Sequence, residues 1–166
     1  MSISLILIPA ALAAAATVGA TGVVGAMSVS ADAGDTGGGG PVPISVQTRM
    51  KDADLLSAAL ADLGAASVSS HDGEITAEID GLSITMALTE DDVWGAHLTH
   101  TDGHEVTEEE ATAFIGRLDA AYVGHVQRAV AQRIRARADA AGFELVSETR
   151  DEDDTVTMVL NVKDYA

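Results

Sequence analysis

The pattern of apolar and polar residues predicts several short strands in the middle of the chain. Apolar and polar residues alternate over residues 44–49, which is typical of a strand with one buried face. Similar strand-forming runs follow at residues 66–69, 74–79, 82–88 and 93–100. Asp-Gly pairs at residues 72–73 and 80–81 separate neighbouring runs and favour tight hairpin turns. We therefore expect a meander of antiparallel strands.

Two other stretches repeat apolar residues at the spacing of a helix. Asp52 is placed to cap the first helix, and Gly64 is placed to end it. Its apolar face consists of Leu55, Leu56, Ala59, Leu60 and Leu63. The second stretch begins at a capping box in residues 107–110 and ends at Gly142, as one long helix or as two with a break near Gly124. Its apolar positions are Ile115, Leu118, Tyr122, Val126, Val130, Ile134 and Ala138.

A last hairpin of residues 143–149 and 155–162 surrounds the acidic turn at residues 151–154. The predicted order of elements is therefore β-α-β-β-β-β-α-β-β. This order predicts the α+β class, an antiparallel sheet with two main helices on one face. In this prediction an apolar N-terminal helix precedes the domain.

The N-terminal segment, residues 1–31, contains no ionisable side chain. The 19 residues from 9 to 27 would span about 28 Å as a helix, close to the bilayer's hydrocarbon thickness of about 30 Å. The apolar residues 3–8 can lengthen this span. The segment therefore predicts a transmembrane helix over residues 3–27, and with it a membrane-associated location.

Two alternatives to a membrane anchor stay open. Residues 31–33 (Ala-Asp-Ala) resemble a signal-peptidase site, although no Lys or Arg precedes Arg49, and cleavage would make the domain secreted. An apolar helix that docks on a protein partner would instead leave the chain cytoplasmic. Small residues at four-residue spacing, Ala11, Ala15 and Gly19, also permit self-association of the segment.

Residues 32–43 are predicted to be a linker, because four consecutive glycines and a Pro-Val-Pro motif disfavour regular structure. The chain then has three parts: an apolar segment over 1–31, this linker, and an acidic α+β domain over 44–166. All 26 acidic and nine basic residues lie beyond residue 31 and give the net charge of −17. Such a charge repels nucleic acid, so no nucleic-acid partner is expected. The absence of cysteine excludes disulfides and zinc–thiolate sites.

Two stretches and two single residues carry a resemblance to a known family. The stretches are TRMKDADLLSAALADLGA at residues 48–65 and GFELVSETRDEDDTVTMVLNV at residues 142–162. Trp94 and Tyr122 fit the same pattern between them. Over residues 44–162 the chain resembles the small proteins of hypothetical chloroplast reading frame thirty-five, which occur in plastids, cyanobacteria and other bacteria.

The resemblance implies a small α+β domain of unknown function, with no assigned catalysis, that is sometimes suspected of working beside AAA-type ATPases. It transfers no catalytic residue to this chain. Members of the family usually start at the first strand, without an apolar segment or a glycine-rich linker. This difference argues against simply assuming the soluble location that the family implies.

Three histidines form a candidate metal site. His97, His100 and His104, with His71 nearby, carry imidazoles that suit zinc, copper or nickel. Positions 97 and 100 point to opposite faces of a strand, so only a turn beginning near Thr99 would bring them together. A solvated hairpin is the simpler interpretation of these residues.

Other polar clusters give no catalytic site. The acidic runs at residues 107–110 and 151–154 lack the spacing of an EF-hand loop, and are interpreted as a helix start and a solvated turn. Motifs of the GxSxG, HExxH and P-loop kinds are absent. No catalytic residue and no cofactor are therefore predicted.

Four arginines in the last turns of the long helix form the candidate binding site: Arg128, Arg133, Arg135 and Arg137. Helical spacing places Arg128 with Arg135 on one face and Arg133 with Arg137 on another. The simplest interpretation is pairing with the helix dipole and with the chain's own carboxylates. The functional hypothesis is docking of an acidic partner or of anionic lipid headgroups, with RNA the least favoured ligand.

The sequence therefore predicts a non-enzymatic adaptor or accessory domain, tethered to a membrane or a protein partner by its N-terminal segment. The arginines and the sheet would bind that partner, and the resemblance suggests an AAA-type ATPase. The alternative is a metal-binding protein or metal-dependent enzyme that uses His97, His100 and His104.

Overall fold

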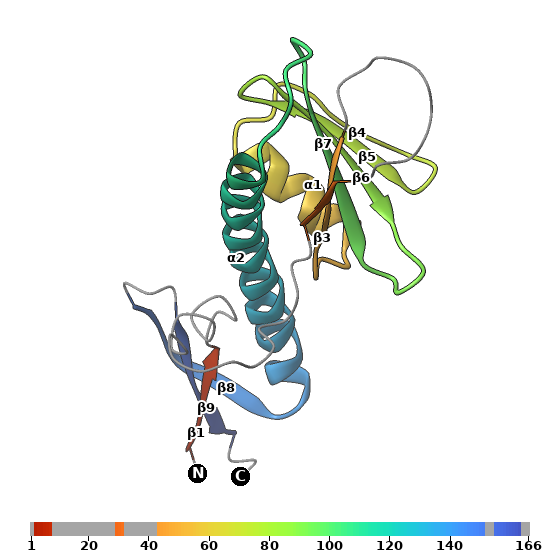
Figure 1. Cartoon of the computed structure of the whole chain (residues 1–166). Helices are drawn as coiled ribbons and strands as arrows, with labels where there is room; N and C mark the ends of the chain where they lie inside the picture. The colour runs from red at the N-terminus through yellow and green to blue at the C-terminus, as the bar shows by residue number, and fades with distance from the viewer. Residues whose placement is uncertain (1, 8–28, 32–42, 152–154, 164–166) are drawn as a thin grey trace. The chain divides into compact units, whose positions relative to one another are not determined.

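The computed structural model describes residues 2–7, 29–31, 43–151 and 155–163 (Figure 1). Its strands are β1 (Ser2–Leu7), β2 (Val29–Ala31), β3 (Ile44–Gln47), β4 (Val68–His71), β5 (Glu74–Ile79), β6 (Leu82–Leu88), β7 (Trp94–His100), β8 (Phe143–Arg150) and β9 (Val156–Val162). Its helices are α1 (Ala53–Asp62) and α2 (Glu108–Ala140).

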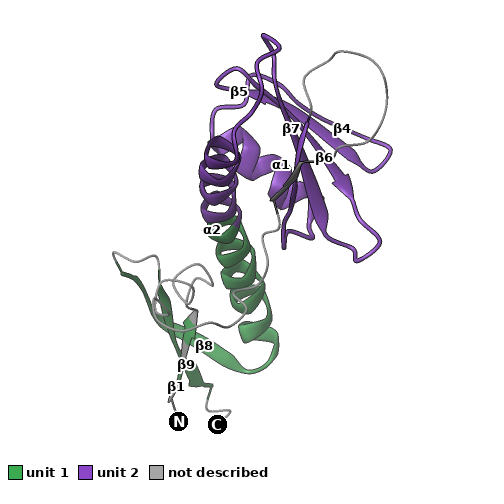
Figure 2. Ribbon diagram, in the orientation of Figure 1, with its two compact units in different colours: residues 1–20, 123–166 green, residues 21–122 purple. Residues whose placement is uncertain are grey.

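The chain divides into two compact units (Figure 2). Residues 21–122 form the first, called the meander unit. Residues 1–20 and 123–166 form the second, called the hairpin unit. Helix α2 contributes its first half to the meander unit and its second half to the hairpin unit.

The meander unit contains an antiparallel sheet in the order β2-β3-β7-β6-β5-β4. Two-residue turns at positions 72–73 and 80–81 join β4 to β5 and β5 to β6. Asp and Gly both have positive φ in these turns, 47° and 80° in the first and 52° and 80° in the second. This geometry matches the right-handed twist of paired strands, so the hairpins predicted from the Asp-Gly pairs are confirmed.

One face of this sheet is buried and the other is exposed. Strand β5 alternates strictly, from exposed Glu74 to buried Ile79. Helix α1 and the first half of α2 cover the buried face (Figure 1). Their fully buried side chains include Leu56, Leu60, Phe114, Ile115 and Leu118. The predicted α+β class, with two helices on one face of an antiparallel sheet, is confirmed in this unit.

The ends of both helices carry the capping groups that the sequence predicts. The Asp52 carboxylate accepts from two backbone N–H groups in the first turn of α1, at 3.0 and 3.1 Å. Before α2, the Glu110 N–H donates to Thr107 Oγ1 at 3.2 Å, and the Glu110 carboxylate accepts from the Thr107 N–H at 3.0 Å. Gly142, at a φ of 80°, follows the end of α2, which is one continuous helix.

The loop between β3 and α1 is tied to α2 within the meander unit. Arg49 donates twice to the Asp119 carboxylate, from Nε to Oδ1 at 2.9 Å and from Nη2 to Oδ2 at 2.6 Å. Tyr122 Oη accepts from the N–H groups of Lys51 and Asp52, at 3.1 and 3.0 Å. Both Asp119 and Tyr122 are buried, so these contacts hold the fold together.

The hairpin unit has its own antiparallel sheet, in the order β1-β9-β8. Ala131 on the second half of α2 packs with Val156 and Met158 of β9 in a small buried cluster, against which Ile134 and Leu145 are partly buried. The sequence predicted the hairpin of β8 and β9 but assigned it to the first sheet. It belongs to a second sheet instead, in which β9 also pairs with β1 along its other edge.

The prediction of a helix over residues 3–27 is corrected only at residues 3–7, which form a strand, and β2 lies just beyond the predicted helix. Strand β1 pairs with β9 from Ser2–Asn161 to Leu7–Val156, and β2 pairs with β3. The first residues of the chain alternate between serine and apolar residues, which is a strand pattern inside an apolar run. The rest of the predicted anchor (residues 8–28) and the linker up to residue 42 lie outside the described residues. Neither described helix is long and apolar enough to cross a membrane.

Candidate functional site

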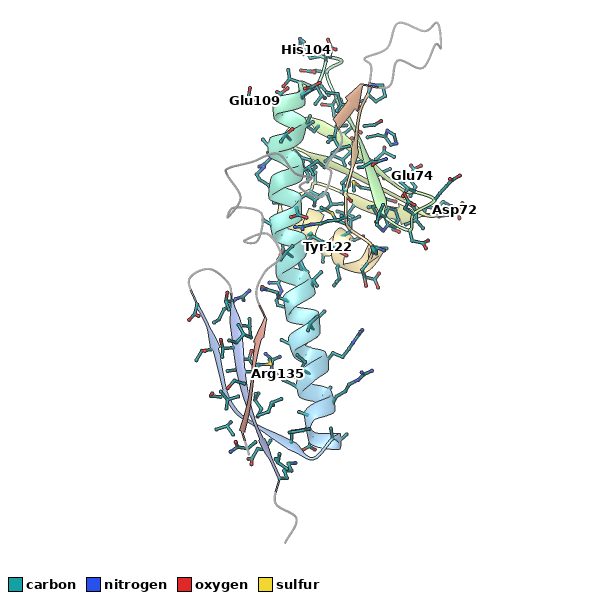
Figure 3. The ribbon with its side chains drawn as sticks, turned by 60° about the horizontal axis from the view of Figure 1, so that its bottom comes forward. Asp72, Glu74, His104, Glu109, Tyr122 and Arg135 are labelled. Atoms are coloured by element: carbon teal, nitrogen blue, oxygen red, sulfur yellow. The ribbon has the colours of Figure 1, made fainter. Side chains whose placement is uncertain are left out.

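The second half of α2 carries the four arginines of the candidate binding site. Its buried stripe includes Gln127, and all four arginines are exposed beside that stripe. At about 100° per residue, Arg128 and Arg135 lie on one flank of the stripe. Arg133 and Arg137 lie on the other, so the structure divides the arginines into the two pairs that helical spacing predicts. Figure 3 labels Arg135 on this half of the helix.

The first cavity, called the α2–β9 groove, has a volume of about 310 Å³. It is lined by Val130, Arg133, Ile134, Arg137, Ala138, Ala141 and Leu160. Apart from the two guanidinium groups, every lining side chain is apolar. Neither Arg133 nor Arg137 has a hydrogen-bond or ion-pair partner within the part of the chain that the structure describes. The groove thus combines an apolar floor with two available cations one helical turn apart.

The second cavity, called the Gln127 cavity, has a volume of about 280 Å³. It is lined by Gln127, Arg128, Ala131, Gln132, Arg135, Glu148, Arg150 and Val156. Arg135 donates twice to the Glu148 carboxylate of β8, from Nε to Oε2 at 2.8 Å and from Nη2 to Oε1. The hydrogen bonds of this ion pair lower the pKa of Glu148 and raise the pKa of Arg135. Arg135 therefore pairs with one of the chain's own carboxylates, as the simplest interpretation predicted.

Gln127 is the unusual residue of this cavity. Gln127 is only 6% exposed, and neither its Nε2 nor its Oε1 has a hydrogen-bond partner among the described residues. Leaving a buried amide unsatisfied costs about 1–3 kcal/mol, and native proteins contain few such groups. The Gln127 amide is therefore a buried polar group that the described residues leave unsatisfied.

The three histidines of the candidate metal site are not brought together. His97 lies on the exposed face of the meander sheet, with Nδ1 2.8 Å from Ser45 Oγ. His100 points to the opposite face, as strand alternation predicts, and its Nε2 lies 3.7 Å from a Glu110 oxygen. His104 instead has its Nδ1 2.9 Å from a carboxylate oxygen of the same loop. Among the described residues, no three His, Asp or Glu side chains are grouped so that they could hold a metal ion.

The two acidic runs have structural roles where they are described. The run at residues 107–110 caps α2, and its hydrogen bonds from Thr107 lower the pKa of Glu110. At the other run, the Asp151 N–H donates to the Thr155 carbonyl at 3.0 Å and closes the turn between β8 and β9. Residues 152–154 lie outside the described residues.

Three contributors to the two cavities were not predicted from the sequence. The sequence indicates the burial of Gln127 only weakly. Gln127 is four residues before Ala131 and therefore lies on the same stripe of the helix. Glu148 and Leu160 come from strands that only the tertiary structure places beside α2. No local pattern could have assigned them.

These features define a class: a small α+β protein with a long helix whose second half is cationic and lines two cavities. No family model, no curated protein and no solved structure matches the chain. The resemblance to the family of hypothetical chloroplast reading frame thirty-five therefore stays a prediction from the quoted residues.

Proposed function

We propose that the chain is a non-enzymatic adaptor whose α2–β9 groove binds an acidic segment of a protein partner. The observation that carries this proposal is the pair of exposed guanidinium groups, on Arg133 and Arg137, above an apolar floor. Carboxylates are the groups that arginine recognises best, through paired hydrogen bonds.

Charge complementarity argues for an acidic occupant. Six of the nine basic residues of the chain lie in residues 123–166, although the whole chain has a net charge of −17. Two of these six border the groove and have no carboxylate partner among the described residues. An acidic ligand would supply those partners.

The apolar floor argues for a peptide with a hydrophobic anchor. Val130 is 37% exposed, and Leu160 of β9 also lines the groove. Arg133 and Arg137 are about 6 Å apart along the helix axis, at 1.5 Å per residue. A short segment with two carboxylates at matching spacing and one aliphatic side chain fits this surface, as in other groove-binding peptides.

The tether and the partner complete the proposal. Residues 2–7 form β1, so they are not part of the proposed tether. The apolar residues 8–28 are the segment that would attach the chain to a membrane or a protein. The partner that the family resemblance suggests is an AAA-type ATPase.

The test measures binding of fluorescent peptides to the full chain in detergent micelles. An acidic peptide with one leucine anchor should bind, and its affinity should fall as salt rises, because screening weakens the charge interaction. The charge reversals Arg133→Glu and Arg137→Glu, combined, should weaken binding by about tenfold or more, as loss of two charge-assisted contacts implies.

The matched control reverses the same number of charges in the meander unit, with Lys51→Glu and Arg117→Glu. This variant has the same net charge and should bind the peptide like the unchanged chain. Equal losses in both double variants, or equal binding of a neutral peptide with the same anchor, would contradict the proposal. Binding to phosphatidylserine vesicles in place of the peptide would assign the groove to lipid and also overturn it.

A further inference from the structure

The α2–β9 groove is bordered by two positive charges that lie one helical turn apart. Arg133 and Arg137 are separated by about 6 Å along the helix axis and by about 40° around it. Both are exposed, and neither has a hydrogen-bond or ion-pair partner among the described residues. Like charges at this spacing destabilise a helix. An anion bound by both guanidinium groups would remove that repulsion.

The opposite flank of α2 shows how an arginine is bound when the chain supplies its own carboxylate. There Arg135 donates to both carboxylate oxygens of Glu148, with Nε at 2.8 Å from Oε2. The described part of β9 instead contributes Leu160 to the α2–β9 groove, and no described carboxylate lines it. Both guanidinium groups of the groove are therefore available to a ligand that carries its own oxyanion.

One compact dianion suits this pair of arginines better than two separate carboxylates. A phosphorylated side chain presents three acceptor oxygens and carries a charge of about −1.5 to −2 at pH 7. It can accept hydrogen bonds from both guanidinium groups while only one side chain of the ligand becomes ordered. Two carboxylates would require two ordered side chains, and each ordered side chain costs conformational entropy.

The rest of the groove restricts what lies next to the phosphate. The other described lining residues are all apolar: Val130, Ile134, Ala138, Ala141 and Leu160. The volume of about 310 Å³ is at the lower end of the range for ligand pockets, which is roughly 300–1,000 Å³. Such a groove suits a short segment with one aliphatic side chain.

The charges and the apolar lining together specify the partner's segment. We infer that the α2–β9 groove binds the dianionic phosphate of a phosphorylated serine or threonine that lies next to an aliphatic residue of the partner. This inference rests on the proposed function, because it assigns the acidic group of the bound segment. It also makes binding conditional on phosphorylation of the partner.

The test compares fluorescent peptides with one leucine and different acidic groups, on the full chain in micelles of a neutral detergent. The peptides carry phosphoserine, unmodified serine or two glutamates. The phosphopeptide should bind at least about tenfold more tightly than the two-glutamate peptide, and the serine peptide should bind most weakly. Equal or tighter binding of the two-glutamate peptide overturns the inference and leaves the proposed function standing. Failure of both acidic peptides to bind overturns both proposals.

The pH dependence identifies the dianion. The second pKa of a phosphorylated side chain is about 6, whereas the pKa of glutamate is about 4.3. Arginine stays protonated throughout, and no histidine or carboxylate among the described residues lines the groove. The affinity for the phosphopeptide should therefore fall by about threefold or more from pH 7.5 to pH 5.5, because the dianion gains a proton. The affinity for the two-glutamate peptide should stay constant. A constant affinity for the phosphopeptide overturns the inference.

Variants assign the phosphate to the pair of arginines. Arg133→Gln and Arg137→Gln should each weaken phosphopeptide binding by at least about tenfold, because each removes charge-assisted hydrogen bonds to the phosphate. The matched control Arg128→Gln removes the same charge on the opposite flank of α2 and should bind the phosphopeptide unchanged. Equal losses in the control and in the groove variants overturn the inference.

Two competitors separate a phosphopeptide from other sources of phosphate. Inorganic phosphate lacks the aliphatic anchor, so it should displace the phosphopeptide only at concentrations at least about tenfold higher than unlabelled phosphopeptide. A water-soluble phosphatidic acid with short acyl chains should compete no better than inorganic phosphate. If either competitor is as effective as the phosphopeptide, the groove binds free phosphate or a lipid headgroup, and the inference is overturned.

Discussion

The two halves of α2 differ in what they bury. In the meander unit the helix buries large side chains, and Phe114 and Leu118 are 1% and 0% exposed. In the hairpin unit its buried positions include the small Ala131 and the polar Gln127. Large side chains fill a core, whereas small ones leave cavities along the helix. The first half is thus suited to stability, and the second half leaves room for ligands.

The two units also differ in charge. The meander unit has 18 acidic and three basic residues, a net charge of −15. The hairpin unit has eight acidic and six basic residues, a net charge of −2, and the two values account for the −17 of the chain. A nearly neutral unit with clustered arginines admits an acidic ligand that the other unit repels. The groove proposed to bind an acidic partner lies in the hairpin unit.

The largest expected effect comes from emptying the core of the meander unit. Phe114→Ala should lower the free energy of unfolding by about 3–5 kcal/mol, because the cavity forms where the side chain is fully buried. Ile134→Ala, at a partly buried position of the hairpin unit, should cost about 1–2 kcal/mol. Urea denaturation measures both values. Fluorescence of Trp94, the single tryptophan, reports the meander unit, and circular dichroism reports the whole chain. Equal costs would mean that the two halves of the helix pack equally well.

The ion pairs of the two units should differ in the same direction. Asp119→Ala removes a buried carboxylate that accepts two hydrogen bonds from Arg49, and it should cost about 1–2 kcal/mol, since Arg49 itself reaches solvent. Glu148→Ala removes the partner of Arg135 at an exposed position and should cost less than about 1 kcal/mol. Urea titrations of the two variants, with Asp119→Asn as the milder control, check this order. A larger cost for Glu148→Ala would reverse the comparison.

The meander was predictable because its signals are local. Strands β5 and β6 have the bounds that the sequence predicts, since each combines an alternating pattern with an Asp-Gly turn of its own. The caps at Asp52 and Thr107 were readable for the same reason, because a cap involves residues only two or three apart.

The hairpin unit was less predictable because its contacts are not local. Strand β1 pairs with a strand more than 140 residues away, so its pairing leaves no trace in its own sequence beyond the alternation of serine and apolar residues. The stripe predicted along α2 was wrong at Val130, which is 37% exposed while its neighbour Ala131 is 3% exposed, although the predicted Ala138 is buried. Leu118 and Ala131 are 13 residues apart, so at about 100° per residue they lie on different stripes of the helix. A single helical period could not predict that change, and so it could not predict that Gln127 is buried.

Acid should destabilise both units, because each contains a carboxyl group with a lowered pKa. The two carboxyl groups differ in the hydrogen-bond partner that lowers it. The pKa of Glu110 is lowered from its ordinary value of 4.5 by hydrogen bonds from Thr107, and the pKa of Glu148 is lowered by Arg135. A carboxyl group with a lowered pKa in the folded state contributes stability that is present above pH 4.5 and is lost as the pH falls through the folded value. Both contributions should therefore be complete at pH 7 and decrease below 4.5.

Salt separates the two contributions. High salt, about 1 M, screens the exposed ion pair between Arg135 and Glu148 but leaves the hydrogen bonds between Thr107 and Glu110 largely intact. The measurement is the fall of the urea midpoint between pH 7 and pH 3, with and without salt. Glu148→Gln should reduce this fall only by the amount that salt also removes. Glu110→Gln should remove a part that persists in salt, as should Thr107→Ala, which also loses about 1 kcal/mol at neutral pH with its cap. If salt abolished the effect of Glu110→Gln as well, the helix start in the meander unit would depend on screened charge, like the ion pair of the hairpin unit, and not on its capping hydrogen bonds.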